Sequence, residues 1–470
     1  METMSRQTYI LNIMDTAPAP FIPPAPIPRT TPPGLLKMFW IVYNNPIELW
    51  GAHSYREPYI YIPSGIGGPL LVANDPKLIR HILVEKSKSF KLAKTRQIVL
   101  RPILQDGLLT AENPVWKRSR KAMAPVFTPR HIHGFAEAML RVTQDYTKKY
   151  QSADNRHDIA KDMTELTFNV LAETLFSNEI EGDPKEFEHK IERLFETVGR
   201  VDPLDIVNIP EWVPRPKHFT GRGILKYFRK LVRKTIEARA AKIEKGETPP
   251  DDFLTLLLEA EGEDGLTREE IEDNVITFIG AGHETTARAL GWTLYLLARA
   301  PHERARVEEE ARRITAEYSN PLDWVNNMPY TRAAFEEAMR LYPPAPVISR
   351  EAIEDIEWED TVITKGSQCL VMPWTLHRHE VYWDQPNAFM PSRFLPENRE
   401  KIDRYQYLPF GAGPRVCIGQ SFAIQEAIII LGVMLSQFRF DMESSEKEPW
   451  PVQKLTTQPD GGLNMVVTPL

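Results

Sequence analysis

Cys417 has the sequence setting of a metal-binding thiolate. It follows a turn that contains Gly411 and Gly413, and an apolar run over residues 422–435 comes soon after it. The run is apolar on nearly every side, which predicts a buried helix. A cysteine just before a helix lies near unpaired N–H groups and the positive end of the helix dipole, so we expect a lowered thiol pKa and a thiolate that ligates a metal. The alternative is that Cys417 is simply a small buried apolar residue, as a lone free cysteine often is.

The residues around Cys417 favour the metal ligand. Gly413 and Gly419 leave out side chains where a large flat ligand would have to approach the backbone. The pattern Phe410-x-x-Gly413-x-Arg415-x-Cys417-x-Gly419 resembles the haem-binding loop of the cytochrome P450 superfamily. The resemblance implies haem b as cofactor, with Cys417 as the proximal ligand of its iron. It also implies haem contacts from four residues of the loop: Phe410, Gly411, Arg415 and Gly419.

Trp116 and Arg120 are four residues apart, so a helix would place them on the same face. On their own they suggest only a cation resting on an aromatic ring. Beside the cysteine loop they resemble the Trp-x-x-x-Arg motif of the family, which implies that both side chains hold a haem propionate. Arg350, after a predicted strand, would offer a further cation to a propionate.

A long helix is predicted from Thr267, which starts a capping-box pattern, to Ala300. Its centre, residues 280–286, is rich in residues that form helices poorly. The Thr285 hydroxyl is able to bond to the carbonyl four residues earlier and bend the helix around Ala281. The alternative is a helix made thin by small residues so that it packs closely against its neighbours.

The centre of this helix is similar to the distal motif of the family, in which an acid and a threonine guide protons toward iron-bound dioxygen. By that resemblance Glu284 and Thr285 are the proton-relay pair, and Ala281 contacts both haem and substrate. A glutamate stands where the family often has aspartate. His283 occupies the variable position of the motif and is not assigned to the iron.

Glu337 and Arg340 lie one helical turn apart. Most such pairs are surface salt bridges that contribute little to stability. Here they resemble the Glu-x-x-Arg motif of the family, and Arg393 follows in a Pro-x-Arg-Phe pattern. The resemblance implies that the three residues form a buried network that braces the haem loop and has a structural role.

Composition excludes some classes of function. The 470 residues carry a net charge of −7 and a pI near 6.0, which argues against a nucleic-acid partner. Two cysteines cannot form a disulfide framework, and Cys417 is needed in its reduced form, so we expect a reducing compartment, the cytoplasm.

The predicted organisation is a proline-rich N-terminal segment, residues 1–34, followed by a single haem domain, residues 35–470. Within the segment, residues 17–33 are expected to be extended and poorly ordered. The family resemblance implies a mainly α-helical, triangular fold with small β-sheets gathered in a β-rich lobe. The longest apolar stretch near the N-terminus, residues 38–43, is far shorter than the roughly 20 residues that span a bilayer. We therefore expect no transmembrane anchor and a soluble, bacterial-type member.

Local patterns predict several elements that would surround the substrate. Hairpins are expected from residues 59–62 with 69–73 and from residues 361–364 with 368–372, where Cys369 would be a buried strand residue. Residues 345–348 should form a strand that lines the pocket. Residues 86–111 show no clean periodicity, and the family has a substrate-covering loop there. The turn near residues 458–462 is expected to send a loop into the pocket.

The resemblance implies a monooxygenase that inserts one atom of dioxygen into a hydrophobic molecule, such as a fatty acid, terpenoid or steroid-like compound. The predicted substrate pocket is apolar and includes Val99, Leu100, Ala281, Val347 and Ile348. Electrons would come from a separate ferredoxin or flavodoxin with its reductase. Its docking site would be basic, formed by Lys117, Arg118, Lys121 and Arg415, although these residues also suit a plain solvated face.

Two rival functions stay open. One is a haem-thiolate enzyme that uses peroxide or isomerises an oxidised lipid. The intact Glu284–Thr285 pair argues against it. The other is a non-catalytic sensor that binds haem or lipid, which the absence of a signalling or DNA-binding module disfavours.

Overall fold

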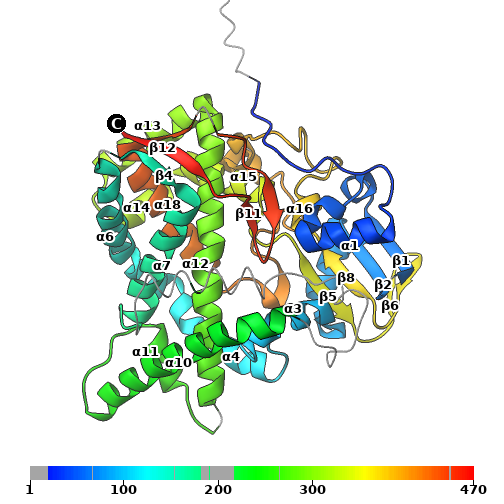
Figure 1. The fold of residues 1–470 in the computed structure, drawn as a ribbon, viewed down its shortest axis with the longest axis horizontal. Helices are drawn as coiled ribbons and strands as arrows, with labels where there is room; N and C mark the ends of the chain where they lie inside the picture. The colour runs from blue at the N-terminus through cyan, green and yellow to red at the C-terminus, as the bar shows by residue number, and fades with distance from the viewer. Residues whose placement is uncertain are drawn as a thin grey trace, which may run out of the picture.

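Helices form most of the protein in the computed structural model, which describes residues 19–65, 67–152, 154–180, 190, 216–263, 265–443 and 446–470 (Figure 1). The fold class, mainly α with small β-sheets, is as predicted. The helices are α1 (Leu35–Asn44), α2 (Pro76–Arg80), α3 (Lys94–Leu104), α4 (Val115–Met123), α5 (Pro129–Gly134), α6 (Ala136–Thr147), α7 (Ile159–Phe176), α10 (Pro216–Glu244), α11 (Phe253–Glu259), α12 (Arg268–Arg299), α13 (Pro301–Glu317), α14 (Pro321–Asn327), α15 (Pro329–Leu341), α16 (Pro373–Leu376), α17 (Pro396–Arg399) and α18 (Gln420–Gln437).

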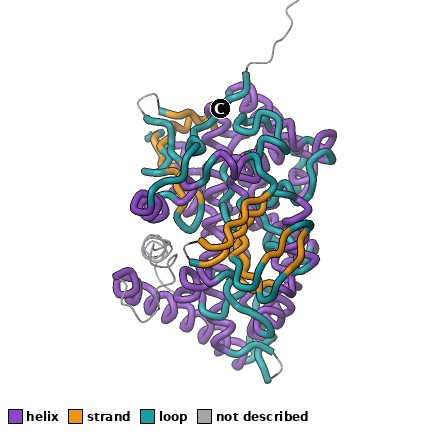
Figure 2. The backbone as a smooth tube through the Cα atoms, turned by 90° about the vertical axis from the view of Figure 1, so that its right-hand side faces the viewer, coloured by secondary structure: helices purple, strands orange, loops and turns teal. Residues whose placement is uncertain are grey.

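The largest sheet joins two distant parts of the chain in the order β1-β2-β8-β5-β3, and Figure 2 shows strands on the side of the molecule that faces the viewer. Smaller sheets have the orders β4-β12-β9, β10-β11 and β6-β7. The strands are β1 (Tyr59–Gly65), β2 (Gly68–Ala73), β3 (Phe90–Leu92), β4 (Arg156–Asp158), β5 (Ile348–Ala352), β6 (Ile356–Trp358), β7 (Thr361–Ile363), β8 (Gln368–Val371), β9 (Phe438–Met442), β10 (Pro451–Gln453), β11 (Thr457–Pro459) and β12 (Asn464–Pro469).

The first predicted hairpin is confirmed by the antiparallel pairing of β1 with β2, but the second is wrong. β7 pairs with β6, whereas β8 lies between β2 and β5. The reason is burial: Cys369 and Val371 are both buried, and the parallel register with β2 sets Cys369 beside Leu71. The pocket strand also begins later than predicted, because β5 starts at Ile348.

The segment predicted to be irregular contains a helix. α3 spans Lys94–Leu104 and has Pro102 inside it, which hides the helical signal in the sequence. The helix forms because it buries Val99, Leu100 and Ile103 against the main core, and this packing outweighs a weak local preference.

α12 is the long central helix that the sequence predicts, and Figure 1 shows it crossing the molecule from end to end. The capping box at its start is complete. The Thr267 hydroxyl accepts the N–H of Glu270 (3.2 Å), and the Glu270 carboxylate accepts the N–H of Thr267 (3.0 Å). α7 packs along this helix, so its central residues are positioned by the core on both sides.

α18 follows the cysteine loop and is the buried helix predicted from the apolar run. Residues from Phe422 to Leu435 are mostly buried. Within the part of the chain that the structure describes, it is the one helix long and apolar enough to cross a membrane, and most of it lies inside the protein. Helices of soluble cores pass the same test of length and composition.

The described part of the N-terminal segment packs against the rest of the chain, contrary to the prediction of poor order. The Phe21 carbonyl accepts the backbone N–H of Phe389 (2.8 Å), and the Pro24 carbonyl accepts the hydroxyl of Tyr342 (2.8 Å). An extended proline-rich backbone has no partners of its own, so its carbonyls are free to accept these bonds.

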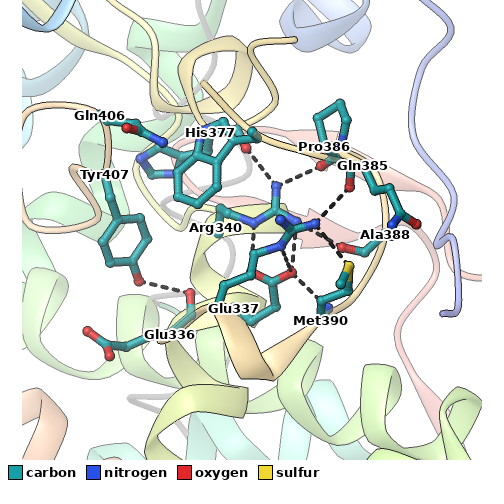
Figure 3. Close-up of polar contacts among 12 residues, drawn as sticks. Glu336, Glu337, Arg340, His377, Gln385, Pro386, Ala388, Met390, Gln406 and Tyr407 are labelled. Carbon is teal, nitrogen blue, oxygen red and sulfur yellow. Dashed lines mark hydrogen bonds and ion pairs between the residues drawn. The ribbon is translucent and has the colours of Figure 1, made fainter. Parts of the chain in front are cut away.

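Glu337 and Arg340 on α15 form a buried network with Arg393, as the motif resemblance implies (Figure 3). Two guanidinium nitrogens of Arg340 donate to the two carboxylate oxygens of Glu337 at 2.6 and 2.8 Å. Arg393 approaches the same carboxylate at 3.3 Å. Arg340 also donates to three backbone carbonyls, those of His377, Pro386 and Ala388.

His377 connects this network to the cysteine loop. Its carbonyl accepts from Arg340, and its ring nitrogen Nε2 accepts the backbone N–H of Leu408 (2.9 Å), two residues before Phe410. Burial, then repulsion from Arg340 and Arg378, lowers the His377 pKa to about 3. The imidazole therefore stays neutral and keeps its acceptor nitrogen, so the network fixes where the loop begins.

We expect Glu337→Gln to lower the free energy of unfolding by about 3–5 kcal/mol, because it leaves two arginines in the interior without their counter-charge. The measurement is urea unfolding followed by circular dichroism. Glu380→Gln is the matched control, because it removes an exposed ion pair with Arg56 and such pairs contribute about 0–1 kcal/mol. Equal losses of stability in the two variants would contradict the bracing role.

Candidate active site

The cysteine loop is folded back on itself just before α18. The backbone N–H of Cys417 donates to the carbonyl of Phe410 (3.0 Å), which closes the loop. Gly411 and Gly413 have φ of 71° and 74°, a conformation that favours glycine. A Cβ atom on Gly413 would lie 1.9 Å from the carbonyl oxygen of Leu83. No other residue fits at position 413 without moving the backbone.

The Cys417 side chain keeps accessible surface although protein atoms surround it densely. Burial raises the pKa of the thiol, and the N–H of Gly419 and the charge of Arg120 lower it by less. The predicted lowering is therefore wrong for the chain alone, because loss of solvation outweighs the helix start. A bound metal ion reverses this balance and holds the sulfur as thiolate.

Trp116 and Arg120, both on α4, reach the residues that flank Cys417. A guanidinium nitrogen of Arg120 donates to the carbonyl of Val416 (2.9 Å). The guanidinium of Arg415 lies 4.7 Å from the centre of the Trp116 ring. The structure thus brings the predicted tryptophan, both arginines and the cysteine loop into one site.

Three arginines gather beside this loop with a single acidic neighbour. Burial, then repulsion from Arg96 and Arg415, lowers the pKa of Arg350 to about 9, and Glu112 opposes this change. Burial and repulsion from Arg415 lower the pKa of Arg96 to about 10. Arg415 donates to the Glu112 carboxylate (2.9 Å), whereas the buried Nε of Arg96 has no hydrogen-bond partner among the described residues. This cluster of Arg96, Arg350 and Arg415 is an incomplete set of ion pairs that attracts further anions.

On α12 the two predicted relay residues are bonded to different groups. The Thr285 hydroxyl donates to the carbonyl of Ala281 (3.0 Å), which is the back-bond that the sequence predicts. Glu284 instead accepts a hydrogen bond from the Thr456 hydroxyl. His283 turns its Nδ1 toward the carbonyl of Ile279 (2.5 Å) and is buried, which lowers its pKa. It is a packed core residue, consistent with leaving it unassigned.

The predicted substrate residues come from α3, from α12, which carries Ala281, and from the start of β5. Val99 and Leu100 are on α3 and belong to the main core cluster, while Ile348 begins β5 and packs with the second cluster beside the loop residue Ala412. The Ile348 side chain is within 3.7 Å of the position that a Cβ of Gly411 would take. Val347, just before β5, is partly exposed.

The model of the family "Cytochrome P450" matches residues 54–465. The chain belongs to the cytochrome P450 family. Cytochrome P450 4V2 of Mus musculus is 29% identical over 387 residues, 77% of this chain and 74% of the relative. The cytokinin hydroxylase of Arabidopsis thaliana is 29% identical over 416 residues, which are 86% of this chain and 80% of the relative. The protein LUTEIN DEFICIENT 5, chloroplastic, of the same plant is 26% identical over 420 residues, which are 85% of this chain and 70% of the relative.

Cytochromes P450 are haem monooxygenases that bind haem b through a cysteine thiolate, so this protein is a haem enzyme. Its residues fit the cofactor. Haem b carries two propionates, and the arginine cluster offers more positive charge than Glu112 balances, with the Nε of Arg96 still unpaired. Cys417 has an accessible thiol, and the glycines of its loop allow a flat ring to come close.

Sequence reasoning missed three residues of this site. Arg96 gave no signal, because it lies in a segment without periodicity or motif and reaches the loop only through the placement of α3. Glu112 contacts Arg415 from a separate turn. Thr456 lies in the β10–β11 hairpin, whereas the predicted pocket loop was a few residues later, at 458–462.

Arg96→Gln should weaken haem retention, because it removes one cation from the cluster whose charge suits the propionates. A hydrogen bond to a charged group contributes about 1.5–3 kcal/mol, so we expect haem to be lost about 10-fold faster or more. The measurement is the rate of haem transfer to an acceptor globin. Lys94→Gln removes an exposed cation from the same helix and serves as control. If the two variants lose haem at the same rate, Arg96 does not hold the cofactor.

Proposed function

We propose that this cytochrome P450 oxygenates a hydrophobic small molecule and that Cys417 is the ligand of its haem iron. The observation that carries the proposal is the accessible thiol of Cys417 beside the arginine cluster. The other cysteine does not compete: Cys369 is buried in β8, and burial raises its thiol pKa to about 12. Cys417 is thus the cysteine with an open sulfur in a loop shaped for a flat ligand.

The haem would be held from two sides. Arg96, Arg350 and Arg415 suit the propionates, since their charges are only partly balanced. Trp116 orients Arg415, and Arg120 fixes the loop through Val416. The remaining contacts with the ring are proposed for Phe410, Gly411, Gly419 and Ala281.

When bound, haem b supplies an iron centre at which dioxygen is activated with two electrons and two protons, so that one oxygen atom enters the substrate and the other leaves as water. The protein must deliver these two protons and keep other protons away from the site. We assign the delivery to Thr285 and Glu284 at the centre of α12. Support comes from the Thr285 hydroxyl, which is only partly buried, and from the buried Glu284 carboxylate one residue before it.

The substrate would contact apolar side chains: Val99, Leu100, Ala281, Val347 and Ile348. Their chemistry suits a fatty acid, a terpenoid or a steroid-like molecule, since no charged group lies among them. Binding of such a molecule excludes water from the site by apolar contact. Selectivity among the three classes would depend on the shape that α3 and β5 give the pocket.

Electrons would come from a separate donor, a ferredoxin or flavodoxin with its reductase. Two of the four predicted docking residues suit this role. Lys117 and Lys121 are exposed one turn apart on α4, whereas Arg118 is paired with Glu270 (2.6 Å) and Arg415 with Glu112. The need to keep the Cys417 thiol reduced favours a cytoplasmic location.

Cys417→Ser should abolish the strongly red-shifted Soret band of the dithionite-reduced, carbon-monoxide-bound protein, whereas Cys369→Ser should keep it. The reason is that only a thiolate ligand of the iron gives this shift. Fatty acids, terpenoids and steroids are then titrated against the ferric wild-type protein for a spin-state change. A band typical of histidine-ligated haem in the wild-type protein would overturn the assignment of Cys417.

The double variant Lys117→Glu/Lys121→Glu should slow reduction of the ferric protein by an acidic ferredoxin or flavodoxin, because attraction between the two surfaces becomes repulsion. Stopped-flow reduction at low and high salt measures the effect, which added salt should diminish. Lys401→Glu, at an exposed position outside α4, is the control. Unchanged rates in the double variant at low salt would remove α4 from the docking site.

A further inference from the structure

The β10–β11 hairpin lies beside the central helix α12 (Figure 1). It is fixed there by its backbone. The indole N–H of Trp292, on α12, donates to the carbonyl of Thr457 (3.2 Å), and the N–H of Thr457 donates to the carbonyl of Pro344 (3.1 Å). The turn between the two strands, residues 454–456, is therefore held against the helix.

From this turn Thr456 reaches the acid of the proposed proton relay. Its hydroxyl donates to Oε1 of Glu284 at 2.8 Å, and both residues are buried, at 4% and 5% exposure. Arg288, one helical turn further along α12, places a guanidinium nitrogen 3.7 Å from the same oxygen. The other oxygen, Oε2, is buried and has no hydrogen-bond partner in the described part of the chain.

The two oxygens of Glu284 therefore have different surroundings: Oε1 has two partners, and Oε2 has no hydrogen-bond partner among the described residues. A buried carboxylate is unfavourable unless it is hydrogen-bonded, and here the Thr456 hydroxyl and the Arg288 guanidinium both lie at Oε1. A glutamate side chain also has several rotamers, and a bond at Oε1 selects among them. Thr456 thus fixes the carboxylate while Oε2 remains available to accept and release a proton.

We propose that Thr456 is a positioning residue for proton delivery: its hydroxyl holds Glu284 in the orientation from which protons pass toward Thr285. The inference rests on the relay role proposed for Glu284. It adds that the C-terminal hairpin, far from the helix in sequence, controls this step. Without the hydroxyl, Glu284 adopts other rotamers, and two electrons and two protons reduce dioxygen to hydrogen peroxide, so that less dioxygen is used to oxygenate the substrate and form water.

Thr456→Val tests the proposal because it keeps the shape of the side chain and removes the hydroxyl. General acid–base catalysis contributes about 100-fold or more to rate, so partial loss of its geometry should lower the ratio of product to peroxide on the order of 10-fold. The solvent deuterium isotope effect on product formation should rise. Thr456→Ser, which retains the hydroxyl, should restore both values.

Thr457→Val is the matched control in the same hairpin. The Thr457 side chain is equally buried, but its hydroxyl has no hydrogen-bond partner among the described residues. A second measurement needs no turnover: infrared spectroscopy of the resting ferric protein. The carboxyl bands of Glu284 are identified as those that vanish in Glu284→Gln. They should shift in Thr456→Val and stay in place in Thr457→Val.

The outcomes distinguish the positioning role of Thr456 from the relay role of Glu284 on which it rests. If Glu284→Gln disturbs the ratio of product to peroxide but Thr456→Val changes neither that ratio nor the infrared bands, the positioning role is overturned and the relay stands. If Thr456→Val and Thr457→Val act equally, the hairpin has only a packing role and the inference fails. If Glu284→Gln leaves the ratio unchanged, the relay itself fails, and the role of Thr456 fails with it.

Discussion

The site depends on the ion pairs that the buried carboxylate of Glu337 forms with two arginines. This carboxylate provides the negative charge that allows Arg340 and Arg393 to lie in the interior. Arg340 then holds the backbone at His377, and the ring of His377 holds Leu408 at the entrance to the cysteine loop. Each link is buried, so breaking one leaves a polar group without a partner and without water. The loop is thereby fixed in one shape by the protein alone.

The arginine cluster beside the loop differs from the Glu337 network, because its positive charges are only partly balanced. Beside Glu337 every guanidinium nitrogen of Arg340 has a partner, whereas Arg96 and Arg350 repel each other and share Glu112 with Arg415. A complete network gives rigidity, and an incomplete one gives affinity for an anion. The two networks therefore have different roles: one shapes the loop, and the other leaves positive charge beside it that suits an anionic group.

The central helix α12 combines scaffold and chemistry. Its two ends are ordinary buried helix, but its middle carries Glu284 and Thr285, each bonded to a different group. Such polar groups are tolerated in a core only when neighbouring elements provide their partners. For Glu284 that partner is Thr456 in the hairpin near the C-terminus, so a segment near the end of the chain meets the central helix at this point.

The sequence by itself determined the features that short spacing encodes: the glycine-rich turn before Cys417, the capped start of α12 and the one-turn pair on α15. These follow from local geometry, which a linear pattern records. Only the tertiary structure decided that α3 is a helix, that β8 pairs with β2, and that Arg96 and Thr456 reach the site. Burial outweighed weak local preference there, and contacts between distant segments leave no periodic trace in the chain.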